Sequence, residues 1–259
     1  MSPTLDDDLR LALELAGAAD AITMQAFRRA DLRVETKPDL TPVTEADRGA
    51  EEMLRERIAA ARPGDAVIGE EYGESGASSR RWYLDPIDGT KNFVRGVPVF
   101  ATLIALEQDG EIVAGVCSAP ALGARWWAAR GGGAFAGGRR ISVSRVARIE
   151  DAFVSYDSVP EFEEEGMGGQ FLGLLRRCWR SRGLGDFWQH VLVAEGAVDV
   201  AVEPVVNPWD LAPLQVIVEE AGGRLTDLSG AARIDGGSVL CSNGLLHDAA
   251  LAALRADRE

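Results

Sequence analysis

The sequence predicts an α+β protein, because helical and strand-like patterns occupy separate stretches of its first half. Apolar residues recur at helical spacing over residues 5–29, and a second helix is expected over 45–61. Strand-like runs then dominate from 66 to 143, with an Asp-Gly turn signal at 109–110 between two of them. In the remaining residues strands and helices alternate, which completes the pattern of a mixed protein.

The second half is expected to alternate its elements around an acidic insert. Strands are expected near residues 152–156, 197–203, 224–226 and 239–241, and helices near 171–179, 187–195, 210–221 and from 245 onward. The insert, residues 160–169, is acidic and contains glycine, so we interpret it as a mobile loop, with a lid as the alternative. With 259 residues and no internal repeat, we expect one compact unit with two halves, 1–147 and 148–259.

The charge balance is acidic, with 41 acidic and 27 basic residues and a net charge of −14. Such a field repels the phosphate backbone of a nucleic acid, so we expect no nucleic-acid partner. It repels a phosphate ester as well, so local cations would be required in a phosphate site. Lys37 and Lys91 are the only lysines in the sequence, and both lie beside acidic motifs, which makes them candidates for phosphate contacts.

The sequence offers no sign of a membrane or a secretory environment. No apolar run is long enough to cross a membrane, and the acidic beginning lacks the basic region of a signal peptide, so we expect a cytoplasmic protein. Cys117, Cys178 and Cys241 are odd in number and lie in apolar surroundings, which predicts reduced core cysteines. His190 and His247 are too few for a zinc site and are expected to be structural or exposed.

The most informative segment is Leu-Asp-Pro-Ile-Asp-Gly-Thr-Lys-Asn-Phe at residues 84–93. An apolar run delivers Asp85 at the expected end of a strand, and Pro86 cannot donate to a strand ladder. Asp88 is expected to face back toward Asp85, and Gly89 permits a close approach of the backbone. The amides that follow would open a helix whose positive end suits a phosphate group.

The spacing of the two aspartates separates two kinds of phosphatase. The pattern D-x-D-G-T places both carboxylates on one face of a strand and uses the first as a nucleophile. Here the pattern is D-x-x-D-G-T, so a turn must bring the carboxylates together, which favours metal binding over covalent attack. An EF-hand is excluded, because Pro86 and Ile87 stand where its loop needs oxygen ligands. A plain acidic turn remains the alternative for this segment alone.

Three further acidic segments have ordinary explanations when each is taken alone. The strand-like run before Glu70 and Glu71 could simply end in a solvated turn. Asp210 lies at the expected start of a helix and could serve as its N-cap. Thr44 and Asp47 match the capping box of the second helix. Their significance comes from their occurrence together.

Taken in order, the strings VTEAD, IGEEYG, LDPIDGTKNF and WDLAPLQVIVEEAGG resemble the inositol monophosphatase family of magnesium-dependent, lithium-sensitive phosphatases. The resemblance spans nearly the whole chain. It implies a layered αβαβα sandwich of the inositol monophosphatase and fructose bisphosphatase type. In such a fold the first half binds metal, and the second half completes the metal site and shapes the substrate pocket. The resemblance also implies a homodimer, and we expect the Gly-rich turn at 130–135 to be a hairpin.

The resemblance implies a set of metal ligands. One Mg²⁺ is expected at Glu70, Asp85 and the backbone carbonyl of Ile87, and a second at Asp85, Asp88 and Asp210. Two or three ions are expected in each active site. Two such ions can clamp the attacking and leaving oxygens of an in-line displacement, so no covalent phosphoenzyme is expected.

The resemblance also implies catalytic and phosphate-binding roles. The Thr90 hydroxyl would orient the attacking water, and either Asp47 or Glu70 would relay its proton; the sequence leaves this choice open. The phosphate would lie against the segment formed by Gly89, Thr90 and Lys91.

Two acidic residues bear on the choice of substrate. Asp186 and Glu203 occupy stretches where family members contact the alcohol half of the substrate, and together they suit a leaving group with an ammonium. Phe187 and Trp188 either flank a flat ring or pack in the core. The strings NFVRGVPVFATLIAL and GDFWQHVLVAEGAVDVAVEP are similar to the family members that hydrolyse histidinol phosphate in histidine biosynthesis.

Two alternatives stay open at this point. One is a phosphatase for inositol monophosphate or for another small polyol or nucleotide phosphate. The other is a metal-binding protein whose main role is contact with another macromolecule and whose catalysis is vestigial. The presence of every expected metal carboxylate argues against the second alternative.

Overall fold

The computed structural model describes residues 4–38 and 40–255 and contains both helices and strands. Within these residues the helices are α1 Leu5–Ala26, α2 Glu45–Ala61, α3 Thr90–Val94, α4 Val159–Glu164, α5 Gly168–Arg177, α6 Asp186–Ala194, α7 Pro208–Glu220 and α8 His247–Arg255, with 3₁₀ turns at Pro120–Leu122 and Ile149–Asp151. The strands are β1 Val34–Thr36, β2 Pro42–Thr44, β3 Ala66–Gly69, β4 Gly73–Ser75, β5 Arg80–Asp88, β6 Ala101–Gln108, β7 Glu111–Ala119, β8 Ala124–Ala129, β9 Gly133–Ala136, β10 Arg139–Arg140, β11 Phe153–Tyr156, β12 Arg180–Gly183, β13 Val200–Glu203, β14 Arg224–Thr226 and β15 Val239–Ser242.

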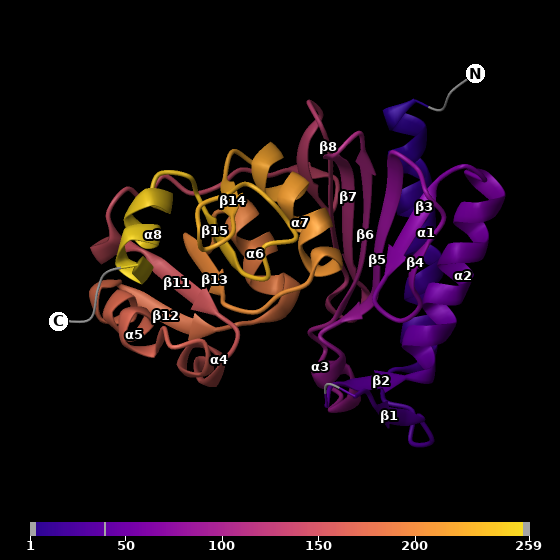
Figure 1. Ribbon diagram of the computed structural model, residues 1–259, viewed down its shortest axis with the longest axis horizontal. Coiled ribbons are helices and arrows are strands. Elements are labelled where there is room, and N and C mark those ends of the chain that lie inside the picture. The colour runs from indigo at the N-terminus through magenta and orange to yellow at the C-terminus, as the bar shows by residue number, and fades with distance from the viewer. Residues whose placement is uncertain (1–3, 39, 256–259) are drawn as a thin grey trace.

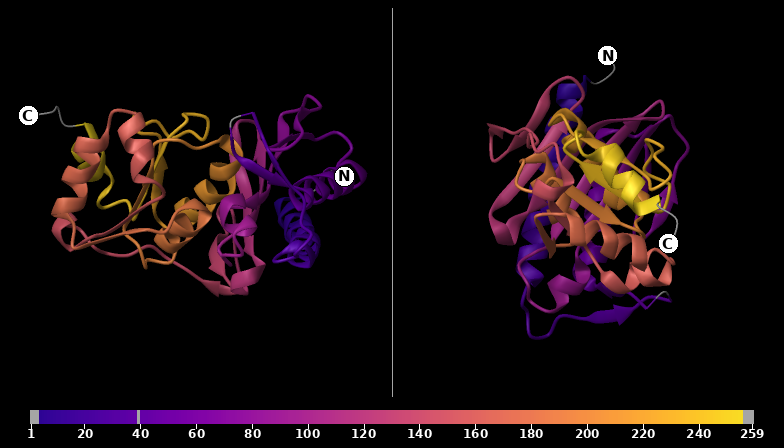
Figure 2. Two further views of the ribbon diagram at one scale, coloured as in Figure 1. Left: turned by 90° about the horizontal axis from the view of Figure 1, so that it is seen from below. Right: turned by 90° about the vertical axis from the view of Figure 1, so that its left-hand side faces the viewer.

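The elements form five alternating layers, which confirms the expected αβαβα sandwich. In Figure 1, helices α1 and α2 lie on one face of a large sheet, and α6 and α7 lie on the other face. A second, smaller sheet follows, and α4, α5 and α8 cover its far side. Figure 2 shows the same succession from two further directions, with the first half of the chain at one end and the second half at the other.

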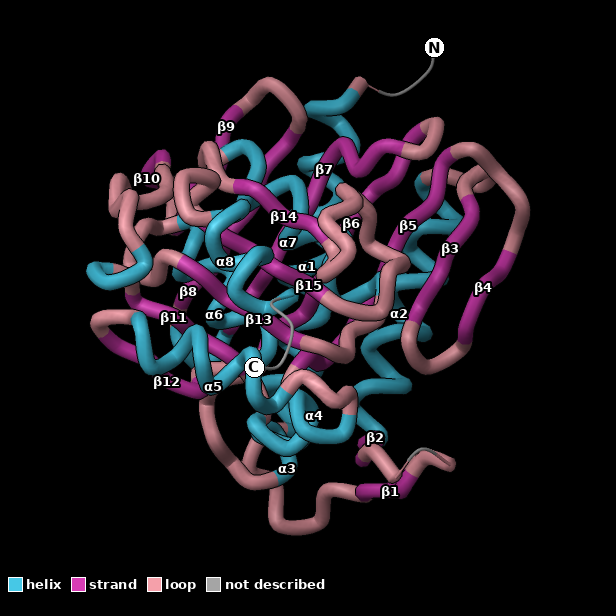
Figure 3. The backbone as a smooth tube through the Cα atoms, turned by 60° about the vertical axis from the view of Figure 1, so that its left-hand side comes forward, coloured by secondary structure: helices cyan, strands magenta, loops and turns pink. Residues whose placement is uncertain are grey.

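The large sheet has eight strands in the order β10-β9-β8-β7-β6-β5-β3-β4, and the small sheet has five in the order β12-β11-β13-β15-β14. Neighbours in the large sheet are antiparallel except β3 and β5, which are parallel. In the small sheet β11 runs parallel to both β12 and β13, so the carboxyl ends of these three strands meet at one edge. A separate pair, β1 and β2, lies beside α3 below the large sheet, as Figure 3 shows.

Apolar side chains fill the space between each pair of layers. Under α1 and α2 the core includes Leu15, Leu54, Trp82 and Leu84, each at most 1 % exposed. Between the large sheet and α7 the largest cluster joins the two halves of the chain. The burial of such side chains contributes about 25 cal/mol for each Å² of apolar surface removed from water.

Helix α7 approaches the large sheet so closely that one position in β7 must be glycine. A Cβ atom built on Gly115 would lie 2.7 Å from the backbone oxygen of Pro213 in α7. A contact this short cannot be relieved by a side-chain rotation, because the opposing atom belongs to the backbone. Gly115 therefore determines how near the second half lies to the sheet of the first half.

Several sequence-based expectations agree with the structure. Helix α2 spans the expected residues, and Thr44 and Asp47 form its capping box. Strands β6 and β7 form the expected hairpin, in which Asp109 and Gly110 have φ values of 53° and 86°. The Gly-rich turn joins β8 to β9 as a hairpin, also as expected. The first helix ends three residues early, at Ala26, and Arg28 leaves the helical region with a φ of 61°.

Other expectations were wrong. The insert over 160–169 is not a loop, because it contains most of α4 and the start of α5, and Phe162 is fully buried and stacks on Phe171. Strands β1, β2 and β12 were not expected, since their three or four residues carry too little apolar periodicity to be recognised. Tertiary packing, and not local pattern, stabilises these segments.

No helix within residues 4–38 and 40–255 combines the length and apolar character that a membrane crossing requires. The three cysteines form no disulfide. Cys117 and Cys241 are buried as expected, whereas Cys178 is partly exposed at the end of α5, so it is not a core residue.

Candidate active site

A bulge in β5 brings the two aspartates of the central motif to the same side. Asp85 is paired with Leu103 and Asp88 with Ala101, so β5 has one residue more than β6 over this interval. The strand therefore does not end at Asp85, as the sequence suggested, but continues past Pro86 to Asp88. An extra residue bends the strand and redirects its side chains, which replaces the expected turn.

Asp210 reaches the same place from the second half of the chain. The carboxylate oxygens of Asp85, Asp88 and Asp210 lie within 4.8 Å of one another. Asp210 is not the N-cap of α7; the N-cap is Asn207, and Asp210 is the third residue of the helix. Its Oδ2 accepts a hydrogen bond of 2.9 Å from the backbone N–H of Asn207, so the capping interpretation and the cluster are compatible.

These three carboxylates line a cleft of about 210 Å³, which we call the acidic cleft. Its lining combines residues of both halves: Thr41, Pro42, Glu70, Asp85, Ile87, Asp88, Gly89, Thr90, Lys91, Asn92, Asp157, Asp186, Asn207 and Asp210. Among the residues to which the resemblance gives a catalytic, metal-binding or substrate-binding role, Asp47 and Glu203 lie outside this lining. Each assigned role stays a prediction, but the structure gathers most of these residues around one space.

Glu70 enters the acidic cleft directly after β3. Its Oε1 accepts a bond of 2.7 Å from the Lys37 ammonium, which also lies 2.6 Å from Glu71. Lys37 therefore contacts the acidic segment itself and balances two of its carboxylates. Burial raises the pKa of Glu71 to about 7.

The segment that carries Glu70 rests on a residue that the sequence analysis did not single out. Glu51 of α2 is fully buried, and it accepts hydrogen bonds from the backbone N–H groups of Glu71 at 2.7 Å and Tyr72 at 3.2 Å. Glu51 also forms an ion pair of 2.7 Å with Arg55. A signal was present, since Glu51 lies on the helix face that also carries buried Leu54, and a charge at such a position needs partners.

Thr90, which lines the acidic cleft, contacts Asp47, which lies outside its lining. The Thr90 hydroxyl lies 2.9 Å from the carbonyl oxygen of Ile87 and 3.3 Å from Oδ1 of Asp47. The other oxygen of Asp47 accepts the capping bonds of Thr44, which fix the carboxylate in place. Burial raises the pKa of Asp47 to about 6, so this group changes its charge near neutral pH.

The start of α6 is bound to the central motif. The backbone N–H of Phe187 donates to Oδ2 of Asp88 at 2.6 Å, and the Asn92 amide donates to Oδ2 of Asp186 at 2.8 Å. Asp186 has a φ of 48°, an uncommon value for a residue with a side chain. Burial raises the pKa of Asp186 to about 8, and the charges of Asp157 and Glu203 add to this shift.

Glu203 lies behind the acidic cleft in the structure. It is 8 % exposed, and its Oε1 lies 2.6 Å both from Nε2 of Gln189, which donates to it, and from Nε2 of His190. Burial lowers the pKa of His190 to about 3, so this histidine is neutral and structural, as expected. Direct contact of Glu203 with a substrate remains a prediction.

The two aromatic residues of α6 belong to the core. Phe187 is 1 % exposed and its ring centroid lies 6.2 Å from that of Trp126. Trp188 is partly buried and packs against the same cluster. The interpretation that Phe187 flanks a ligand ring was therefore wrong, and the core alternative is correct.

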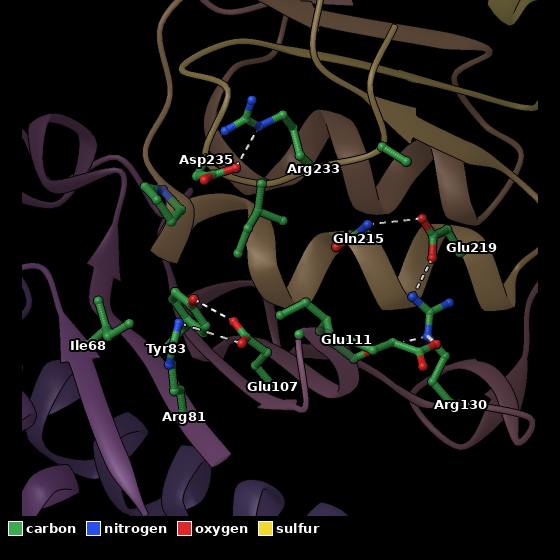
Figure 4. Close-up of a pocket in the computed structure, with 15 residues that line it drawn as sticks. Ile68, Arg81, Tyr83, Glu107, Glu111, Arg130, Gln215, Glu219, Arg233 and Asp235 are labelled. Atoms are coloured by element: carbon green, nitrogen blue, oxygen red, sulfur yellow. Dashed lines mark hydrogen bonds and ion pairs between the residues drawn. The ribbon is translucent and has the colours of Figure 1, made fainter. Parts of the chain in front are cut away.

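A larger cavity, of about 650 Å³, lies between the large sheet and α7, as Figure 4 shows. Its charged groups pair with one another: Arg81 with Glu107, Arg130 with Glu219, and Arg233 with Asp235. None of the residues to which a metal, catalytic or substrate role was assigned lines it. Size alone would favour this cavity, but the convergence of carboxylates makes the smaller cleft the candidate active site.

The acidic cleft destabilises the metal-free protein at neutral pH, which predicts an unusual pH dependence. Burial raises the pKa of Asp47 to about 6, of Asp210 to about 7 and of Asp186 to about 8, above the value of about 4 in an unfolded chain. Between pH 4 and 8 these carboxylates therefore bind more protons in the folded state than in the unfolded state, so their contribution to stability rises as pH falls, against a smaller opposite contribution from the buried His190 and His247. We expect the melting temperature in EDTA to rise from pH 8 to pH 6.

The same measurement in Mg²⁺ supplies the control. A divalent cation binds the ionised carboxylates, so its stabilising effect should be largest at pH 8 and smaller at pH 6. A melting temperature in EDTA that falls from pH 8 to pH 6 would contradict the account of the acidic cleft.

The fold and the acidic cleft together define a class of protein: a layered α+β scaffold that gathers carboxylates from both halves in an arrangement suited to divalent cations. The chain belongs to the inositol monophosphatase family, whose family model matches residues 4–259. Members of this family are metal-dependent phosphatases, which agrees with the three carboxylates of the cleft.

Known relatives match almost the entire chain. A histidinol-phosphatase of Mycobacterium tuberculosis is 56% identical over 96% of this chain and 98% of its own length. A histidinol-phosphatase of Streptomyces coelicolor is 52% identical over 97% of this chain and 98% of its own. Among solved structures, the inositol monophosphatase of Thermotoga maritima has a TM-score of 0.87 and 36% identity, with 96% of both chains covered.

Proposed function

We propose that this protein hydrolyses L-histidinol phosphate to L-histidinol and inorganic phosphate in histidine biosynthesis. The observation that carries the reaction class is the convergence of Asp85, Asp88 and Asp210, with oxygens within 4.8 Å of one another, in a cleft next to Thr90. The protein is thus a phosphoric monoester hydrolase. The choice of substrate is supported by the histidinol-phosphatases that are 56% and 52% identical to it.

The donor atoms of the acidic cleft suit Mg²⁺. They are carboxylate oxygens, without histidine or cysteine, and hard cations of this kind prefer oxygen ligands. We assign Glu70, Asp85 and the carbonyl of Ile87 to one ion and Asp85, Asp88 and Asp210 to another, in a site of two or three ions. Bound Mg²⁺ would supply Lewis-acid polarisation and charge neutralisation at the phosphoryl group.

The residues beside this cluster would prepare the attacking water. Thr90 can orient a water through its hydroxyl, and the contact of 3.3 Å from this hydroxyl to Asp47 supplies a route for the proton. The pKa of Asp47, raised by burial to about 6, suits a group that accepts a proton near neutral pH. Glu70 is the alternative, but Lys37 already binds its Oε1, so the geometry favours Asp47.

Both halves of the chain would be needed for the reaction. Residues 1–147 supply Glu70, Asp85 and Asp88, and residues 148–259 supply Asp210 and Asp186. We assign metal binding to the first part and substrate shaping to the second, in one compact unit. The homodimer and the cytoplasmic location expected from the sequence remain predictions.

An inositol-phosphate phosphatase is the second candidate. A fructose-1,6-bisphosphatase/inositol-1-monophosphatase of Thermotoga maritima is 38% identical over 93% of this chain and 93% of its own length. The residues proposed to bind metal and to orient the water would act in the same way on either substrate. Selectivity between the two substrates therefore depends on the residues that contact the alcohol part of the ester.

The test is phosphate release by the purified protein in Mg²⁺. We expect kcat/KM for histidinol phosphate to exceed that for inositol 1-phosphate, fructose 1,6-bisphosphate and adenosine 3′,5′-bisphosphate by about tenfold or more, a common size for selectivity within a family. Preference for another of these esters would support the assignment as a phosphatase but contradict the assignment of histidinol phosphate as the substrate. Inactivity on all four would support the non-catalytic alternative.

A further inference from the structure

Asp157 lines the acidic cleft, although no sequence motif pointed to it. It follows β11 directly, at the edge where the carboxyl ends of β11, β12 and β13 meet. Its neighbours in the lining of the cleft include Lys91 and Asp186. The edge formed by the carboxyl ends of parallel strands is a common place for ligand contacts.

The carboxylate of Asp157 differs from every other carboxylate in the lining. Each of the others accepts a hydrogen bond from a protein group: Glu70 from Lys37, Asp85 from the N–H of Ile87, Asp88 from the N–H of Phe187, Asp186 from Asn92, and Asp210 from the N–H of Asn207. Within residues 4–38 and 40–255, Asp157 makes no hydrogen bond and no ion pair. A partly buried carboxylate without a donor is costly, and a ligand can supply that donor.

The backbone of Gly185 lies very close to the carboxylate of Asp157. A Cβ atom built on Gly185 would lie 2.2 Å from Oδ1 of Asp157, and Gly185 has a φ of 69°. Only glycine fits a position that is both this crowded and in the left-handed region. The chain segment that leads into α6 therefore packs directly against the Asp157 carboxylate.

The electrostatic surroundings favour a cation. Lys91 and His190 are the groups that lower the pKa of Asp157, while burial raises it, and His190 is neutral at working pH. Among the described residues, Lys91 is the cation that acts on Asp157, Asp186 and the nearby Glu161, so the three carboxylates outnumber it. An additional positive charge brought by a ligand would balance this excess.

Two buried acceptors belong to the residues that contact Glu203. Nδ1 of His190 and Oε1 of Gln189 have no hydrogen-bond partner among the described residues, although both side chains are at most 1 % exposed. In the tautomer in which Nε2–H of His190 donates to Glu203, its Nδ1 is an acceptor. The two side chains that contact Glu203 therefore each keep one acceptor without a donor among the described residues.

We infer that Asp157 binds the ammonium group of the substrate and thereby selects an aminated alcohol over an uncharged polyol. This inference rests on the proposed function, which supplies the phosphate-binding end of the same cleft. The ammonium would donate to Asp157 in a charge-assisted hydrogen bond, with Asp186 beside it as a second carboxylate. Glu203, whose Oε1 contacts Gln189 and His190, would support these residues from behind.

The test compares two esters that differ only in the amino group: histidinol phosphate and 3-(imidazol-4-yl)propyl phosphate. In Asp157→Asn we expect kcat/KM for histidinol phosphate to fall by about 10- to 100-fold, mainly through KM, because a charge-assisted bond is lost. For the ester without the amino group, kcat/KM should change by less than about twofold. Glu164→Gln removes one exposed negative charge from α4 and serves as the control for net charge.

The possible outcomes are distinct. Selective loss on the aminated ester, with none in Glu164→Gln, supports the inference. Equal losses on both esters, or a shifted Mg²⁺ dependence on both, would assign Asp157 a structural or metal-binding role and overturn it. A wild-type protein that turns over both esters equally would overturn it too, whereas one inactive on histidinol phosphate would overturn the proposed function itself. If Asp157→Asn does not fold, Asp157→Ser applies the same comparison.

Discussion

Asp85→Asn is expected to lower kcat/KM by about a thousandfold or more while leaving the fold intact. Asp85 is 2 % exposed, and its oxygens belong to the cluster that spans 4.8 Å. An amide keeps the size of the side chain and can keep the acceptor for the N–H of Ile87 at 2.9 Å, but it removes the charge that holds a cation. Metal catalysis is worth several kcal/mol, and each 1.36 kcal/mol is a factor of ten in rate.

The stability of Asp85→Asn gives a second readout that does not depend on activity. Burial and the nearby charges of Glu70, Asp88 and Asp210 raise the pKa of Asp85 well above its usual range, so its charge opposes folding without metal. We expect the melting temperature of the variant in EDTA to equal or exceed that of the wild type. The rise caused by Mg²⁺ should be lost.

Asp109→Asn is the matched control for this experiment. Asp109 is exposed in the turn between β6 and β7, with a φ of 53° that asparagine also tolerates. It should change neither activity nor the response to Mg²⁺. Retention of Mg²⁺-dependent turnover by Asp85→Asn would refute the assignment of the carboxylate cluster as the metal site.

Glu51→Ala is expected to destabilise the folded state by about 3 kcal/mol, the lower end of the range for breaking a buried ion pair from one side. The change leaves the N–H groups of Glu71 and Tyr72 without their acceptor and removes the ionic partner of Arg55, whose guanidinium keeps its bonds to Ser75 and Gly73. It also releases the segment that carries Glu70 into the acidic cleft. Urea unfolding, in EDTA and in Mg²⁺, measures the loss directly.

A neighbouring residue of the same type supplies the control for Glu51. Glu52 is exposed on α2, and its replacement by alanine should change the free energy of unfolding by less than about 0.5 kcal/mol. In Glu51→Ala the Mg²⁺ concentration for half-maximal activity should rise, because Glu70 is no longer held in position. Equal losses of stability in the two variants would show that Glu51 does not organise this segment.

Much of the candidate site could be predicted because its parts are local in sequence. Asp85 and Asp88 are separated by two residues, and Thr44 and Asp47 form a capping box within one helical turn. Capping preferences, glycine turns and proline breaks act over a few residues, so their chemistry is visible in the sequence alone. Their roles in binding and catalysis remain predictions that the experiments above test.

Features that depend on long-range packing could not be predicted in the same way. The bulge in β5 arises from pairing with β6, so the sequence suggested a strand end where the strand continues. Phe187 and Trp188 fit both a ligand wall and a core, and only the position of α6 decided between them. The acidic insert contains helix α4, which is stabilised by the stacking of buried Phe162 on Phe171.

The sequence by itself determined which chemical groups are available: an acidic set without metal-binding histidines or cysteines, a Gly-Thr turn, and two lysines beside the motifs. Only the tertiary structure decided which of these groups meet. Asp210 joins Asp85 because α7 packs on Gly115 of the large sheet, and Asp157 enters the cleft because β11 ends beside α6. The physical reason is that local preferences act within a few residues, whereas convergence of distant carboxylates requires the burial of the cores that bring the two halves together.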